Sequence, residues 1–312
     1  MPMALTLRQM RYFVTLADTG SFSAAAARVH VSQPALSIQI KEMEAHLGAP
    51  LVERLPRAIR LTRLGHEVLG RARRVLAEVD DLEQAARWRD GLAGRLHLGV
   101  IPTVAPYLLP PALTRIRASD LTLDIRVREA QTAALLDALQ RGRIDAAVVA
   151  LPVSAEGLET VTLFEDRFLL AGSEQRLSRW RGREDRLRPV ALEPDQLLLL
   201  DEGHCLADQA LDVCGMTGRR QVDLGASSLS TLCGLVSQGF GLTLLPELAV
   251  RTEAAAAPGL RLMRFAAPEP ARDIALVRRA GSADDRWVGE LAQLLAGAGE
   301  GPIRHARSAV PA

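Results

Sequence analysis

The 312-residue sequence lacks any apolar run long enough to cross a membrane. A spanning helix needs about 18 or more consecutive apolar residues, and polar or charged residues interrupt every such stretch of this chain. The opening segment MPMALTLRQMRYF also lacks the charged-then-apolar order of a secretion signal. We therefore expect a cytoplasmic protein that has no membrane partner.

Cysteine and histidine are also scarce. The three cysteines are Cys205, Cys214 and Cys233, and in the reducing cytoplasm thiols do not form a structural disulfide framework. Of the six histidines, no two have the spacing of ligands on one helix face, and only His204 adjoins a cysteine. We expect neither a metal site nor a bound cofactor.

The charge is unevenly distributed along a chain that is too long for one typical domain. Hydrophobic residues make up 48% and charged residues 24%, which is ordinary for a globular protein with substantial cores. Residues 1–75 carry eleven basic and five acidic side chains, a net charge of +6, within a chain whose total is +1. A basic head on a mildly acidic body favours a nucleic-acid binder. A chance skew on a solvated surface is the alternative.

Residues 1–62 have the pattern of a winged helix-turn-helix DNA-binding domain. Short amphipathic segments precede a helix that starts at Ser32, and Pro34 lies in its first turn, where a proline removes no hydrogen bond. Leu51–Leu61 alternates apolar and basic residues, which predicts a two-stranded wing. Candidate DNA contacts lie on the outward face of the helix and on the wing, and the alternative is a solvated polar face. These candidates are Ser32, Gln33, Pro34, Ser37, Gln39, Lys41, Arg54, Arg57 and Arg60.

Residues 63–90 predict one long dimerising helix. Apolar positions recur there at alternating steps of four and three, and no proline interrupts them before Trp88. This spacing forms a coiled-coil seam, which a second helix must cover. We expect a homodimer, because helix-turn-helix proteins commonly bind paired half-sites. A helix packed on its own domain is the alternative.

Residues 95–300 predict an α/β domain with mostly parallel sheets, because short apolar strands alternate with helices. Such folds bind small ligands at the carboxyl ends of their strands. The tail 301–312 is expected to be disordered. The expected strands are 96–101, 121–127, 145–151, 167–172, 196–201 and 241–246.

The N-terminal run LRQMRYFVTLADTGSFSAAAARVHVSQPALSIQIKEMEAHLGAPLVER resembles the LysR-type transcriptional regulators. The resemblance implies a winged helix-turn-helix, a linker helix and a two-lobed effector domain shaped like a periplasmic binding protein. The implied lobes are residues 95–165 with 268–300, and residues 166–267. A homotetrameric activator is also implied, with double-stranded promoter DNA and RNA polymerase as partners. Ile38 departs from the pattern, since many members carry a basic residue there.

Four further runs resemble the branch of this family that senses hydrogen peroxide: LGVIPTVAPYLLP, EAQT, LLLLDEGHCLADQALDVC and SQGFGLTLLPELAV. By this resemblance Cys205 is the peroxidatic cysteine and Cys214 the resolving one. Their reversible disulfide would be reopened by a dithiol reductant. The residues implied near the bound peroxide are Thr103, Thr132 and His204.

The residues themselves also indicate a reactive thiol at Cys205. It opens a segment of helix-tolerant residues, and both a helix dipole and the adjacent imidazole favour a thiolate there. Cys214 falls on the apolar side of this segment, so we expect it to be buried when reduced. Nine helical residues place the two Cα atoms about 13 to 14 Å apart, whereas a disulfide needs them within about 7 Å. We hypothesise that oxidation unwinds this helix, shifts the packing of the subunits and respaces the DNA-binding heads.

Each assignment has a simpler alternative. A cysteine is often a small buried hydrophobe, which is our expectation for Cys233. Thr103 could cap a helix, and His204 could lie on the surface. Ala207 replaces a basic side chain of relatives, so the tuning of the thiolate can differ.

Three other functions compete with a peroxide-sensing regulator. The first is a LysR-type regulator that responds to a small organic effector, with incidental cysteines. The second, a thiol peroxidase, would not need the basic head. The third, a solute-binding receptor, should carry an export signal.

Overall fold

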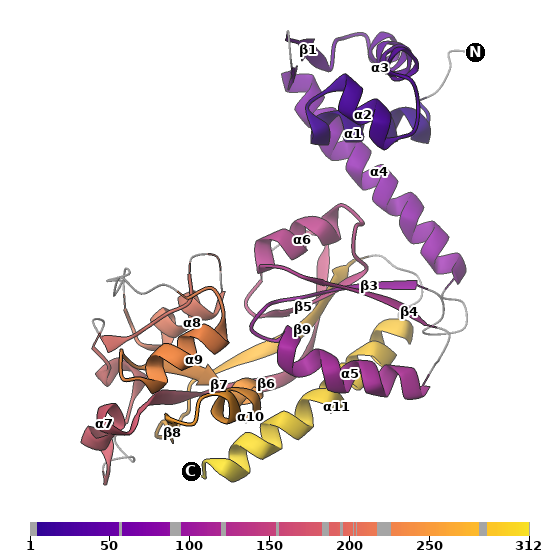
Figure 1. Cartoon of the computed structure of the whole chain (residues 1–312). Helices are drawn as coiled ribbons and strands as arrows, with labels where there is room; N and C mark the ends of the chain where they lie inside the picture. The colour runs from indigo at the N-terminus through magenta and orange to yellow at the C-terminus, as the bar shows by residue number, and fades with distance from the viewer. Residues whose placement is uncertain are drawn as a thin grey trace. The chain divides into compact units, whose positions relative to one another are not determined.

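The computed structural model describes residues 5–55, 58–87, 95–119, 123–153, 156–182, 187–193, 196–201, 203, 205–216, 226–280 and 286–311. The chain forms two compact units that divide within one long helix, after Ala86 (Figure 1). No helix within the described ranges is long and apolar enough to span a membrane.

The N-terminal unit has the predicted order of helices followed by a wing. Thr6 caps its first helix reciprocally with Gln9, and Ser32 caps the third by accepting the amide proton of Ala35. Gly20 and Gly48 end these two helices with φ angles of 67° and 74°, in the left-handed region that glycine tolerates. The elements are α1 (Leu7–Thr19), α2 (Phe22–Arg28), α3 (Gln33–Leu47), the antiparallel pair β1 (Val52–Arg54) and β2 (Ile59–Leu61), and α4 (Arg63–Arg87).

The core of this unit is small and apolar. Its fully buried side chains come from α1, α2 and α3 and from the residue that precedes β1, so the three helices and the wing share one interior. That interior fixes the orientation of α3, whose opposite face stays exposed. The largest members of this core are Phe13, Leu16, Leu36, Ile40, Met43 and Leu51.

The C-terminal unit is an α/β domain whose strands form one twisted sheet. Their order in the sheet is β4-β3-β5-β9-β6-β7, and β8 pairs additionally with β6. The strands are β3 (Arg95–Val100), β4 (Asp124–Glu129), β5 (Ala146–Ala150), β6 (Leu158–Ser173), β7 (Thr243–Pro246), β8 (Leu260–Arg264) and β9 (Ala271–Arg279). The helices are α5 (Ala105–Ser119), α6 (Thr132–Gln140), α7 (Glu174–Leu177), α8 (Cys205–Val213), α9 (Leu229–Ser237), α10 (Glu247–Ala256) and α11 (Arg286–Ala309).

The expectation of mostly parallel sheets is wrong. Among the described strands only β3–β4 and β3–β5 are parallel, whereas β5–β9, β6–β9, β6–β7 and β6–β8 are antiparallel. The physical reason is that β6, sixteen residues long, and β9 pair along most of their length and belong to both halves of the sheet. Figure 1 shows these two strands running from the β3–β5 half to the half that holds α8 and α9. The segment expected as a strand at 196–201 contributes isolated parallel bridges.

The expectation of a disordered tail at 301–312 is also wrong. α11 (Arg286–Ala309) continues through most of this segment, and Ile303 is buried. Arg307 pairs with the fully buried Glu247 at 3.1 Å between Nη2 and Oε2. The run GAGEGP at 297–302, where this segment begins, lowers helix propensity. Tertiary burial and the ion pair outweigh that local preference.

Candidate functional site

Cys205 is the first residue of α8 and is partly exposed. It lies two residues after Gly203, whose φ of 90° lies in the region that strongly favours glycine. A Cβ atom on Gly203 would also lie 2.5 Å from the side-chain Oε1 of Gln131. The start of α8 is therefore held closely against the residue that precedes α6.

Thr132, the first residue of α6, provides a hydroxyl with unused hydrogen-bonding capacity. Its Oγ1 is buried and has no hydrogen-bond partner among the described residues. Leaving a buried polar group unpartnered costs about 1 to 3 kcal/mol. Thr132 directly follows Gln131, whose side chain lies against Gly203, two residues before α8.

Thr103 belongs to a buried ionic network. Its Oγ1 accepts a hydrogen bond from Nη1 of Arg272 at 3.0 Å, and its carbonyl oxygen accepts one from Nη2 at 3.3 Å. Arg272 also pairs with Asp166 through Nε and Nη2, at 3.0 and 2.9 Å from Oδ2. All three residues are at most 3% exposed. Because the Thr103 oxygen accepts from Arg272, its hydroxyl proton is left to donate elsewhere.

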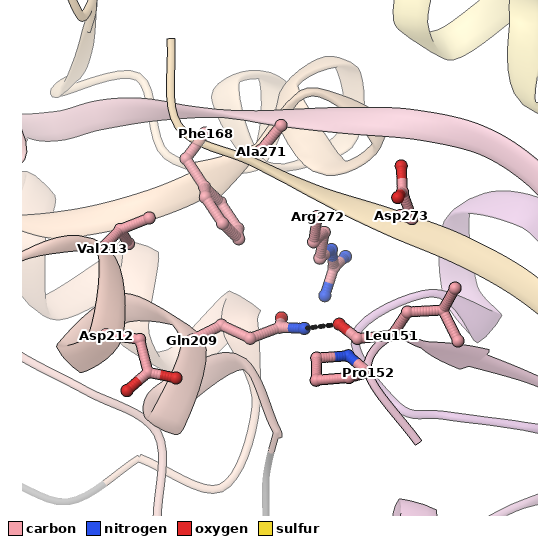
Figure 2. A pocket seen from close by; sticks show the side chains of 9 residues that line it. All are labelled: Leu151, Pro152, Phe168, Gln209, Asp212, Val213, Ala271, Arg272 and Asp273. Carbon is pink, nitrogen blue, oxygen red and sulfur yellow. Dashed lines mark hydrogen bonds between the residues drawn. The ribbon is translucent and has the colours of Figure 1, made fainter. Parts of the chain in front are cut away.

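A cavity of about 390 Å³ lies between α8 and the strands that connect the two halves of the sheet (Figure 2). The side chain of Gln209 enters it from α8, with Nε2 donating to the carbonyl oxygen of Leu151 at 3.1 Å. Its Oε1 is buried and has no partner within the described ranges. The cavity is lined by Leu151, Pro152, Phe168, Gln209, Asp212, Val213, Ala271, Arg272 and Asp273.

Two of the residues that line this cavity, Gln209 and Arg272, are related to Cys205 and to Thr103 respectively. Gln209 lies four residues after Cys205, and side chains at that spacing share one face of a helix. Arg272 lines the cavity and binds Thr103 directly. A ligand in this cavity would thus meet the amide of Gln209 and the guanidinium of Arg272.

Cys214 lies at the opposite end of α8 and is 4% exposed. Its amide donates to the carbonyl oxygen of Ala210 at 3.2 Å, so helical geometry extends to this cysteine. Burial raises the pKa of its thiol to about 11. The prediction that Cys214 is buried is confirmed. Along an intact α8, the Cα atoms of Cys205 and Cys214 are nine residues apart, with a rise of about 1.5 Å for each residue.

Cys233 is a core residue of α9, as predicted. Its side chain is fully buried. Burial, and secondarily the charge of Glu253, raises the pKa of its thiol to about 12. It packs in the apolar interior of the domain, on α9.

Several predicted DNA contacts have partners inside the protein. The Ser37 hydroxyl accepts from Arg54 Nη2 at 2.9 Å, and Gln39 donates to Glu42 at 2.7 Å. Arg60 donates to Glu53 at 2.9 and 2.6 Å through Nε and Nη2. The remaining described candidates are exposed on α3 or at its cap: Ser32, Gln33, Pro34 and Lys41. Arg57 and His204 lie outside the described residues.

The site contains three residues that the sequence analysis did not single out. Gln209 could have been found, because its spacing of four from Cys205 places both on one helix face. Arg272 and Asp166 could not, because they lie 169 and 63 positions from Thr103 along the chain and meet it only in the folded sheet.

Comparison with known proteins adds independent information. Residues 7–66 match a family described as bacterial regulatory helix-turn-helix protein, lysR family, and residues 89–299 match the LysR substrate binding domain. A probable hydrogen peroxide-inducible genes activator from Streptomyces viridosporus is 43% identical over 93% of both chains.

Solved structures also resemble the whole chain, among them the following two. A full-length OxyR from Pseudomonas aeruginosa with a cysteine-to-aspartate substitution is 33% identical, with a TM-score of 0.73 over 94% of this chain and 98% of its own. A cysteine mutant of OxyR from Corynebacterium glutamicum, bound to hydrogen peroxide, is 35% identical, with a TM-score of 0.67 over 99% of this chain and 97% of its own.

Proposed function

Because this chain belongs to the LysR family of bacterial regulators, we propose that it is a transcriptional activator that senses hydrogen peroxide. It acts in the cytoplasm as a homotetramer on double-stranded promoter DNA and on RNA polymerase. The observation that carries the proposal is the arrangement of α8. A partly exposed Cys205 begins this helix and a buried Cys214 follows its end. The hydroxyl of Thr132, at the start of α6, is buried and has no partner among the described residues.

The first chemical step is oxidation of Cys205. Its thiolate attacks one oxygen of hydrogen peroxide, the O–O bond breaks, and the leaving hydroxide takes a proton to become water. The Thr103 and Thr132 hydroxyls donate hydrogen bonds to the oxygens, and the unpartnered Oε1 of Gln209 accepts one. His204 lies next to the thiol in the chain. Cys205 is left as a sulfenic acid.

The second step joins the two cysteines. The Cys214 thiol attacks the sulfenic sulfur, the S–O bond breaks, water leaves and a disulfide forms. A disulfide requires Cα atoms within about 7 Å, so α8 must unwind before Cys214 reaches Cys205. A dithiol reductant restores both thiols by two successive exchanges.

Unwinding of α8 supplies the signal. α8 contributes three cavity-lining residues, and Gln209 joins it to Leu151 at the end of β5. Loss of the helix removes this connection between the two halves of the domain. The remodelled domain then changes how subunits pack and how the DNA-binding heads are spaced, as a two-state element does.

On DNA, α3 enters the major groove and the wing contacts phosphates. Gln33 and Lys41 meet bases or phosphates directly, and Ser32 and Pro34 lie at the end of α3 that enters first. Arg54, Arg57 and Arg60 bind the backbone. The hydrogen bonds of Arg54 with Ser37, of Arg60 with Glu53 and of Gln39 with Glu42 give the free domain a fixed arrangement before it meets DNA.

Mass spectrometry of the reduced full-length protein after a brief stoichiometric dose of peroxide tests the sensor. With free thiols trapped and peptides mapped, we expect a Cys205–Cys214 disulfide within seconds. Cys205→Ser should abolish the reaction, and Cys214→Ser should stop it at the sulfenic acid. Cys233→Ser is the matched control and should react like the wild type. Both Cys205 and Cys214 remaining reduced would contradict the proposal.

The cavity beside α8 favours a second candidate, a regulator that responds to a small organic effector. Its volume of about 390 Å³ and the unpartnered Gln209 oxygen suit a small ligand with a hydrogen-bond donor. A conformational response to a metabolite that persists in Cys205→Ser would favour this reading over the peroxide sensor.

A further inference from the structure

Ile38 is an exposed apolar residue on the DNA-facing helix. Its side chain is 55% exposed. Among the residues of α3, all of which the structure describes, it is the one exposed large hydrophobic residue. It is the sixth residue of the helix and so lies in the second turn. The N-terminal turns of a recognition helix are the part that contacts base edges.

In this turn of α3, Ile38 is the exposed side chain that no hydrogen bond within the domain engages. Ser37 accepts a hydrogen bond from Arg54, and Gln39 donates to Glu42, so both adjacent polar side chains are engaged within the domain. One turn before Ile38 lies the exposed Pro34, and one turn after it the exposed Lys41. An apolar patch therefore precedes a cation along one face of α3.

An isoleucine has no hydrogen-bonding group, so it gains nothing from a phosphate or from a polar base edge. The major groove offers one apolar group, the C5 methyl of thymine. The net charge of +6 on residues 1–75 draws this face to DNA. We propose that Ile38 packs on a thymine methyl and specifies thymine at one position of each half-site, an inference that rests on the proposed DNA-binding function.

Replacing thymine by uracil tests this contact, because uracil lacks only the methyl group. Binding sites are first selected from a random duplex library with the reduced full-length protein. Each thymine of a selected site is then replaced in turn, and Kd is measured by fluorescence anisotropy at fixed salt. One position per half-site should lose about fourfold in affinity, the effect of one buried methyl group, and replacement in both half-sites about sixteenfold.

Ile38→Ala should bind thymine and uracil duplexes equally at that position and keep the wild-type thermal midpoint, because the side chain is exposed. Lys41→Ala is the matched control on the same face. It should weaken both duplexes alike and retain the preference for thymine.

Two outcomes would overturn the inference, and they are distinguishable. If DNA is selected but no thymine position distinguishes the wild type from Ile38→Ala, Ile38 does not contact a methyl group. If no duplex is selected at all, the proposed function fails together with the inference.

Discussion

At the residue scale, Thr103 and Thr132 have opposite hydrogen-bonding situations. The Thr103 oxygen accepts from Arg272 inside a buried ion network. The Thr132 oxygen is buried with no partner in the described part of the chain. The two hydroxyls are thus equivalent toward peroxide in our proposal but differ in what they contribute to the fold.

This difference predicts different consequences for two isosteric substitutions. Thr132→Val should slow oxidation of Cys205 about tenfold or more, the effect of a lost transition-state hydrogen bond, with no loss of stability. Thr103→Val should slow oxidation similarly and also destabilise the protein by about 1 to 3 kcal/mol, because it removes an acceptor from a buried guanidinium. Stopped-flow peroxide kinetics and urea unfolding measure the two effects. A loss of stability in Thr132→Val would contradict the assignment.

The buried thiol of Cys233 makes a prediction about pH. Its pKa rises from an ordinary 9.0 to about 12 in the folded protein, chiefly through burial. Between these values the folded state keeps a proton that the unfolded state releases. The free energy of unfolding therefore falls as the pH rises, by about 1.4 kcal/mol per pH unit for this one group.

Urea unfolding at pH 8, 9 and 10 under reducing conditions measures this slope. Cys233→Ala leaves a small cavity, which lowers the free energy of unfolding by the same amount at every pH. The substitution also removes the thiol that titrates. The difference between wild type and variant should therefore diminish as the pH rises from 9 to 10. Parallel stability profiles over that range would contradict a raised thiol pKa.

At the element scale, α8 is both the support of the cavity and the barrier to the disulfide. Asp212 lies in its last turn, where the helix dipole disfavours a carboxylate. Asp212→Ala and Asp212→Gly both remove this charge and its cavity contact, but alanine favours the helix over glycine by about 1 kcal/mol. If unwinding limits the second step, the glycine variant should form the disulfide about five times faster than the alanine variant.

Trapping the sulfenic acid with a carbon nucleophile measures the rate at which Cys205 is oxidised, separately from the rate at which the disulfide then forms. Both variants should form the sulfenic acid at the same rate, because Cys205 is unchanged and lies at the opposite end of the helix. Equal rates of disulfide formation would show that the second step does not require unwinding.

Elements defined by local patterns could be predicted from the sequence. The Ser32 cap, Pro34 in the first turn and Gly48 at the end delimit α3 without reference to the rest of the chain. α8 and its buried Cys214 follow in the same way from the spacing of apolar residues.

Features that depend on distant contacts could not be predicted. The direction of β9 follows from its pairing with β6 about a hundred residues earlier, and nothing within its own sequence specifies an antiparallel neighbour. The end of α11 is helical because Arg307 reaches the buried Glu247. In the site, Arg272 supports Thr103 across 169 positions, which no local pattern reveals.

At the scale of the whole molecule, α4 carries an apolar seam that its own unit leaves open. Val75 and Leu82 are 40% and 72% exposed and lie one heptad apart. A heptad-spaced apolar seam is covered by a second helix in a coiled coil. The same spacing in the sequence predicted a homodimer. The exposure of these two side chains supports that prediction, because exposed leucine and valine gain stability when a partner covers them.

Substitution on this seam should dissociate the assembly. Leu82→Glu places a charge where the partner helix would pack, so sedimentation velocity should detect a shift to smaller species at micromolar concentration. Affinity for a two-half-site duplex should then fall about 100-fold or more, because the two heads no longer bind as one linked unit. Arg74→Glu is the matched control, since Arg74 is exposed one residue before the seam position Val75, and it should leave the sedimentation profile unchanged. A Leu82→Glu protein that sediments like the wild type would mean that surfaces other than α4 hold the subunits together.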